Sequence, residues 1–184
     1  HTIVYRQAGR FAGWPANHGI WCWGDEIVVG FELGHYKKNP TGGHDIDRDK
    51  PSVPRQARST DGGETWTIER PGYVDESGNE SPPRSLTTPS HCSTPDLAVK
   101  LRMAKRYHSP DRCRSWKGPF ELPSFGRPGL LARTDYLIEG KDRLTAFAAA
   151  EKESGGEGQP LCMRTTDGGL NWELVGWIGK QPPA

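Results

Sequence analysis

The stretch STDGGETW at residues 59–66 is repeated along the chain, and this repeat decides how the sequence is interpreted. It returns as TTDGGLNW at residues 165–172, and a degraded copy, SPDRCRSW, occupies residues 109–116. The three octets begin 50 and 56 residues apart, an interval typical of propeller blades. One DGG turn could be an ordinary hairpin, but three copies in register indicate a repeated structural unit.

Each octet places a hydroxyl, an aspartate and a tryptophan at the same offsets. An aspartate just inside a tight hairpin can accept hydrogen bonds from the backbone N–H groups of the turn, and glycine supplies the positive φ that the turn needs. The tryptophan begins the returning strand, where its ring can cover the turn. We therefore expect a structural role for Ser59, Asp61, Gly63, Trp66, Ser109, Asp111, Trp116, Thr165, Asp167, Gly169 and Trp172.

Short alternating segments flank the first and third octets and predict four strands around each. The expected strands span residues 19–23, 26–32, 56–59, 65–70, 130–138, 143–149, 161–165 and 171–178. The middle of the chain has a helix-start signal, with Pro95 directly after the hydroxyl of Thr94. The apolar residues nevertheless alternate at period two over residues 97–103, so we interpret this segment as the inner part of a second blade.

The composition agrees with an all-β protein. The 184 residues include 23 Gly and 16 Pro, which indicates many tight turns. A net charge of +1 gives no electrostatic reason to expect a nucleic acid or an anionic membrane as a partner. No apolar run approaches the roughly 20 residues that a membrane-spanning helix needs.

The four cysteines, Cys22, Cys92, Cys113 and Cys162, form no CxxC pair, which argues against a zinc site. In an exported protein they could form two disulfides by any of three pairings, and in a cytosolic protein they would be free thiols. The first residue, His1, is compatible with a removed leader, a trimmed chain or an internal piece. We expect a secreted or periplasmic protein without a metal or another cofactor.

The octets resemble the Asp-boxes of the sialidase superfamily, whose members are six-bladed β-propellers with the box between the outer two strands of a blade. Residues 9–66 and 119–172, which include FGRPG at 125–129 and ARTDY at 132–136, are also similar to bacterial proteins called sialidase-like or exo-α-sialidase. Asp-boxes occur as well in propellers that are receptors, assembly factors or glucanases. The resemblance therefore bears more directly on the fold than on the reaction.

With this resemblance, the expected fold class is an all-β propeller of sialidase type. The chain would supply about three four-stranded blades of six, at approximately residues 9–72, 86–123 and 127–180. Half a ring would expose two blade faces and leave sheet edges unprotected. We therefore expect this to be the N-terminal half of a longer polypeptide, or a chain whose partner supplies the rest of the propeller.

The resemblance also implies a ligand site at the mouth of the central channel, where inner strands begin and away from the octets. Sialidases bind the substrate carboxylate with three arginines, whose planar donor forks match it. They use a tyrosine activated by a glutamate as nucleophile and an aspartate as acid/base, an exception to the two-carboxylate scheme. In the family the tyrosine, its glutamate and two of the arginines come from later blades, which this sequence does not contain.

Arg10 resembles the first family arginine in position, although its proline follows after five residues instead of two. Asp47, and after it Asp45, lies in the loop that precedes the strand leading into the first octet, where the family has its acid/base. Proton donation near neutral pH would need a carboxyl whose pKa is raised. A solvated loop or a calcium loop is the alternative, and Arg48 and Lys50 weaken the calcium version.

Four further residues are candidates for substrate binding. We expect His91 and Asp96 where the second blade begins, and Arg133 and Asp135 beside the inner strand of the third. From these positions each could reach a central ligand, although each residue type is more often structural.

Our leading hypothesis is a retaining, sialidase-like glycoside hydrolase acting on glycans that end in an acidic sugar. Arg10 would then bind the carboxylate and Asp47 would transfer the proton. A propeller that binds glycans or proteins without catalysis is the alternative, and a polysaccharide lyase acting on uronates is a third possibility.

Overall fold

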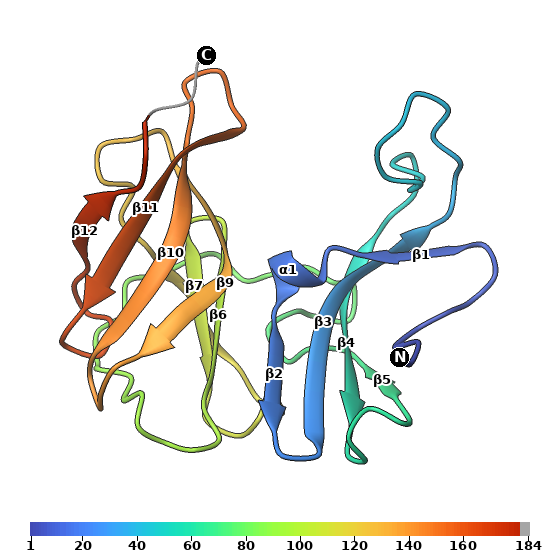
Figure 1. The fold of residues 1–184 in the computed structure, drawn as a ribbon, viewed down its shortest axis with the longest axis horizontal. Coiled ribbons are helices and arrows are strands. Elements are labelled where there is room, and N and C mark those ends of the chain that lie inside the picture. Colours follow the sequence, from blue (N-terminus) through green and yellow to red (C-terminus); the bar gives the residue numbers. More distant parts are fainter. Residues whose placement is uncertain (181–184) are drawn as a thin grey trace.

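The computed structural model describes residues 1–180 of the chain, which form an almost entirely β protein with one short helix. Three antiparallel sheets of five, three and four strands follow one another along the sequence (Figure 1). The expected all-β class is thus confirmed. No described helix has the length and apolar character required to cross a membrane.

The first sheet is organised around one long central strand. Its strands are β1 (Arg10–Gly13), β2 (Ile20–Trp23), β3 (Glu26–His35), β4 (Val53–Ser59) and β5 (Thr67–Glu69). The first half of β3 pairs with β2 and its second half pairs with β1, while β4 covers its other edge. The helix α1 (Pro15–His18) connects β1 to β2. β1 and β2 therefore run in the same direction along one edge of β3, one after the other.

The second and third sheets follow the same plan with fewer additions. Their strands are β6 (Ala98–Arg102), β7 (Lys105–Ser109), β8 (Lys117–Glu121), β9 (Leu130–Ile138), β10 (Leu144–Glu151), β11 (Glu157–Thr165) and β12 (Glu173–Trp177). All eight strands expected around the first and third octets are present, with shifted ends. The sequence analysis did not anticipate β1, β7, β8 or α1.

The three octets occupy equivalent positions, between the last two strands of each sheet. In the first octet Gly63 N donates to Ser59 Oγ at 2.8 Å, and Thr65 N donates to Asp61 Oδ1 at 2.9 Å. The second and third octets make the same two bonds at the same offsets, with distances of 2.8 to 3.0 Å. The octets are therefore turn staples, as their residue types predicted.

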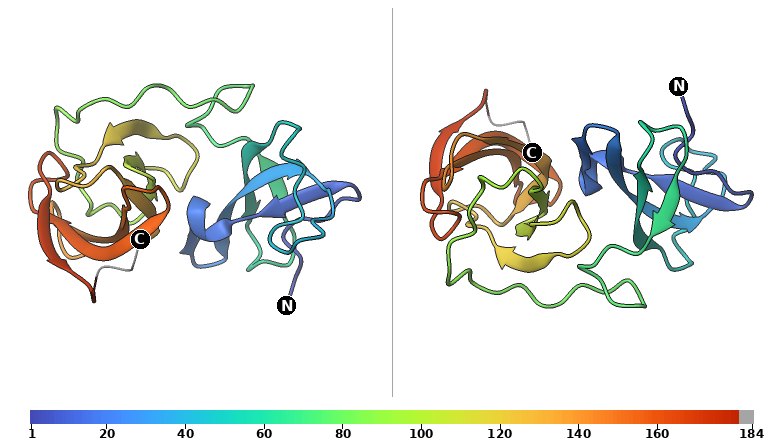
Figure 2. Two further views of the ribbon diagram at one scale, coloured as in Figure 1. Left: turned by 90° about the horizontal axis from the view of Figure 1, so that it is seen from above. Right: turned by 90° about the horizontal axis from the view of Figure 1, so that it is seen from below.

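The middle sheet departs from the expectation of four strands. In the register, β3, β6 and β10 each begin beside the first residue of an octet, so β6 corresponds to the second strand of the other sheets. Residues 70–97, which would supply an inner strand, run along the outside from the first sheet to the second (Figure 2). This segment contains five prolines, which cannot donate to a ladder.

Burial on both faces explains why residues 97–103 form a strand in spite of the helix-start signal. Val99 and Leu101 lie in the apolar core shared with the third sheet, whereas Lys100 points the other way and is fully buried. Trp21 Nε1 donates to Val99 O at 3.2 Å, which ties β2 to β6. The strand β6 therefore joins the first and third sheets at the centre of the molecule.

Candidate functional site

The ends of the sheets opposite the octets are the place to search for a ligand site. β2 ends beside the first residue of β3, and β9 ends beside the first residue of β10. Because β3 and β10 begin next to an octet, β2 and β9 begin at the opposite side. The helix α1 lies immediately before β2 (Figure 1). Two groups of polar side chains gather at this side, one at the end of β3 and one between α1, β6 and β9.

The first group contains Arg10 and Asp47. Arg10 lies directly across from His35 in the β1–β3 ladder, and Arg10 Nη1 is 3.2 Å from His35 Nε2. Asp47 N donates to His35 O at 2.8 Å. The fold thus brings these two sequence candidates to opposite sides of one residue.

The electrostatic surroundings of Asp47 favour its ionised form. The residue is buried, its Oδ1 accepts from Asp49 N at 3.3 Å, and Lys37 Nζ and Lys50 Nζ lie 3.5 and 3.6 Å from its carboxylate. Burial alone would raise the pKa of Asp47, but the hydrogen bond and the lysine charges outweigh it and lower the pKa. Proton donation near neutral pH needs the opposite shift.

Asp45 is held in the same way. Asn39 N donates to Asp45 Oδ1 at 2.9 Å, and Lys38 Nζ lies 3.2 Å from Oδ2. The backbone hydrogen bond is the main cause of a lowered pKa, with the Lys38 contact second. The loop therefore presents two carboxylates rather than a carboxylic acid.

Asp96 lies just before β6, the first strand of the second sheet, but both His91 and Asp96 lie at the octet ends of the sheets. The expectation that they could reach a central ligand at the opposite side is thereby corrected. Asp96 Oδ1 accepts from Arg112 Nε, in the second octet, at 2.6 Å. His91 Nδ1 is 2.5 Å from Asp142 Oδ1, beside the third octet. The reason is the direction of β6, which begins next to an octet rather than at the opposite side.

The second group lines a cavity of about 410 Å³ between α1, the end of β6 and the start of β9. Its polar lining consists of Asn17, Glu80, Arg102, Lys105, Arg133 and Glu157. Arg133 was a candidate from the sequence. Asp135, two residues further along the same face of β9, does not line this cavity.

Ion pairs hold the cations of this cavity. Glu80 bridges two of them, with Arg102 Nη1 at 2.7 Å and Lys105 Nζ at 2.8 Å. Burial alone would raise the pKa of Glu80, but the hydrogen bond from Lys105 and the Arg102 charge are among the contacts that lower it. Arg133 pairs with Glu157 at the rim. Three cations thus face two carboxylates.

The sequence analysis missed Arg102, Lys105 and Glu80. One signal was available, because Arg102 and Lys105 flank a two-residue turn between alternating segments and so had to lie at one end of a hairpin. Glu80 carried no such signal, since residues 70–97 have no periodic pattern.

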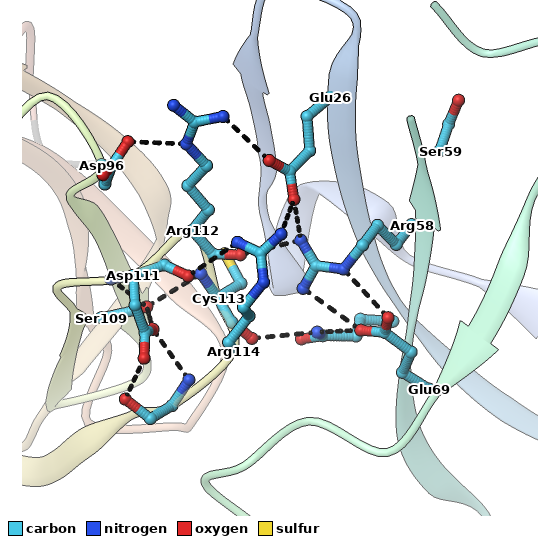
Figure 3. Close-up of polar contacts among 12 residues, drawn as sticks. Glu26, Arg58, Ser59, Glu69, Asp96, Ser109, Asp111, Arg112, Cys113 and Arg114 are labelled. Carbon is cyan, nitrogen blue, oxygen red and sulfur yellow. Dashed lines mark hydrogen bonds and ion pairs between the residues drawn. The ribbon is translucent and has the colours of Figure 1, made fainter. Parts of the chain in front are cut away.

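A further polar cluster lies near the octet ends and joins the first and second sheets (Figure 3). The buried Glu26 accepts hydrogen bonds from Arg58 at 2.6 Å, Arg112 at 3.0 Å and Arg114 at 2.8 Å. Arg58 comes from β4, whereas the other two arginines belong to the second octet. Its position between two sheets gives this cluster a structural role.

Within residues 1–180, no group of three or more His, Cys, Asp and Glu side chains is placed to hold a metal. The four cysteines are free. Comparisons of the chain with protein-family models, with curated proteins and with solved structures find no match.

Proposed function

We propose that this chain is part of a sialidase-like propeller that acts on glycans ending in an acidic sugar. The observation that carries the proposal is the repetition of one octet geometry on three successive sheets, with a cation-rich cavity at the opposite side. A scaffold that places its staples at one side leaves the other side free for a ligand. The chain would be completed by further blades from the same gene or from a second chain.

Within this proposal, Arg10 and Asp47 are the hydrolytic candidates, because both adjoin His35, Arg10 through its guanidinium and Asp47 through its backbone N–H. A second candidate function is glycan binding without hydrolysis. The lowered pKa values of Asp45 and Asp47 favour it, since both carboxyls are ionised near neutral pH. Completing blades would have to reverse this shift for Asp47 to donate a proton.

Two measurements on the complete propeller, in which further blades from the same gene or a second chain join this chain, test the proposal. Binding of a sialylated oligosaccharide is compared with binding of the same oligosaccharide after removal of its sialic acid, and turnover of a fluorogenic sialoside is followed in parallel. We expect binding that depends on the acidic sugar. Turnover abolished by Asp47→Asn and by Arg10→Ala would support hydrolysis, whereas binding without turnover would support the second candidate. Equal binding of both oligosaccharides, or of neither, would contradict the proposal.

A further inference from the structure

Two arginines face each other across the junction of β6 and β9. Met103 N donates to Ala132 O at 3.0 Å, and Ala132 N donates to Met103 O at 3.3 Å, which makes an antiparallel bridge. In an antiparallel pair the residue before one partner lies opposite the residue after the other. Arg102 and Arg133 are therefore cross-strand neighbours, and both line the cavity. Like charges in this position destabilise a sheet.

The carboxylates of the cavity do not fully compensate for this repulsion. Glu80 is shared by Arg102 and Lys105, and Glu157 pairs only with Arg133 among the cavity cations. Hydrogen bonds among the described residues use only Nη1 of the Arg102 guanidinium, which carries five N–H donors in total. Several N–H donors of Arg102 are therefore left for an anion, while Glu32 also interacts with the charge of this guanidinium.

The remaining lining suits a small polar molecule with an apolar side. The volume of about 410 Å³ falls within the roughly 300–1,000 Å³ of small-molecule sites. Met103, which is 48% exposed, and Leu131 supply apolar surface, while Asn17 supplies an amide. A sugar ring offers matching C–H faces and hydroxyl groups.

We propose that this cavity is a carboxylate-binding site for a sugar acid, contacted by Arg102, Lys105 and Arg133. The proposal deepens the function proposed above and rests on it, but it uses cations other than Arg10 and needs no hydrolysis. The ligand carboxylate takes the free donors of Arg102 and displaces Glu157 from Arg133. That exchange is inexpensive because both side chains of this ion pair are more than half exposed.

The test is a protein-detected NMR titration of the 184-residue chain with glucuronate, N-acetylneuraminate, acetate and glucose. Glucuronate and glucose differ only in the carboxylate. We expect both sugar acids to shift the amides of Met103 and Ala132 and to bind at least about tenfold more tightly than glucose, as a charge-assisted hydrogen bond implies. Acetate should bind more weakly than either sugar acid.

Four variants give the inference its sharpest test. Arg102→Gln and Arg133→Gln should each weaken binding of the sugar acids about tenfold or more. Glu80→Gln should strengthen it several-fold, because it releases the donors of Arg102 and Lys105. Arg143→Gln is the matched control, since Arg143 pairs with Glu139 away from the cavity, and should leave affinity within twofold.

The outcomes separate the two proposals. Failure of every sugar acid to bind would overturn the cavity assignment, whereas the proposed function is decided by the oligosaccharide comparison on the complete propeller. Binding that is unchanged in Arg102→Gln, Arg133→Gln and Glu80→Gln would overturn the cavity assignment and leave the proposed function standing. Arg133 is half exposed, so its variant is the least able to disturb folding, and the amide spectrum of each variant verifies that it does fold. Acetate binding as tightly as glucuronate would overturn the sugar-acid assignment.

Discussion

Glu26→Gln tests the cluster that joins the first and second sheets. The carboxylate is buried and accepts from three guanidinium groups, so an amide in its place leaves three cations short of one anion. Removing one partner of a buried ion pair typically costs about 3–5 kcal/mol. Arg58 and Arg112 retain Glu69 and Asp96 as partners, which places the expected loss near the lower end, about 3 kcal/mol.

The same substitution also predicts how the stability difference between the two proteins depends on pH. Burial alone would raise the pKa of Glu26, but the hydrogen bonds from Arg112 and Arg58 outweigh it and lower the pKa. A group whose folded pKa is depressed stabilises the protein above its unfolded pKa, and this stabilisation is lost as the pH falls through the folded value. The difference between the unchanged chain and Glu26→Gln should therefore be constant near pH 7 and shrink below about pH 4.

The assay is urea unfolding followed by tryptophan fluorescence, with thermal melts in parallel. Trp21 and Trp116 report on the junction, since their ring centroids are 5.4 Å apart between the two sheets. For a domain of this size about 3 kcal/mol corresponds to a fall in Tm of about 6–12 °C. Glu153→Gln, at an exposed turn, is the control and should stay within about 0.5 kcal/mol. A loss below about 1 kcal/mol for Glu26→Gln would refute the reasoning.

Two further substitutions test the octet geometry and the buried centre. Gly169→Ala should destabilise the chain by more than the roughly 1–2 kcal/mol that a left-handed residue costs, because φ is +93° and a Cβ would also meet the Arg106 guanidinium. Gly155→Ala is the control for the backbone cost alone, since Gly155 has φ +78° and open space around it. Equal losses of stability in the urea assay would contradict the contact with Arg106. Lys100 is fully buried, and burial lowers its pKa to about 7. At this group the unfolded state binds more protons between about pH 7 and 10, so its contribution to stability should rise with pH in that range. Lys100→Met should remove this contribution, so the stability of the unchanged chain relative to the variant should increase from pH 7 to pH 9 in urea unfolding. The same pH dependence in both proteins would count against the buried amine.

The fold was predictable wherever the local sequence of one segment specifies its turn or its strands. The octets carry the turn chemistry and the hydroxyl, aspartate and tryptophan that recur in the hydrogen bonds, so their positions and the flanking strands followed from local sequence. The direction of β6 did not, because residues 97–103 alternate identically whichever end begins beside the octet. That choice is made by pairing Ala98 with Ser109, and it moved Asp96 to the octet side.

The candidate cavity was less predictable, because its cations meet across sheets. Arg102 and Arg133 become neighbours only through the bridge between Met103 and Ala132, and Glu80 reaches them from a segment without periodic structure. Resemblance could only nominate Arg10 and Asp47 as candidates, from their order along the chain. It could not show that two lysines hold Asp47 ionised.

The degraded second octet keeps the turn geometry although it lacks the two glycines of the other octets. Arg112 and Cys113 stand where the other octets have two glycines, and both keep the left-handed backbone, with φ of 56° and 64°. Such residues cost about 1–2 kcal/mol each relative to glycine. Here the side chains of Arg112 and Cys113 make stabilising contacts that glycine cannot make, and these offset the backbone strain. Arg112 pairs with Glu26 and Asp96, and Cys113 is fully buried beside Trp21. In the middle sheet, the octet thus has a more strained backbone than its two counterparts, but its side chains connect it to the first sheet.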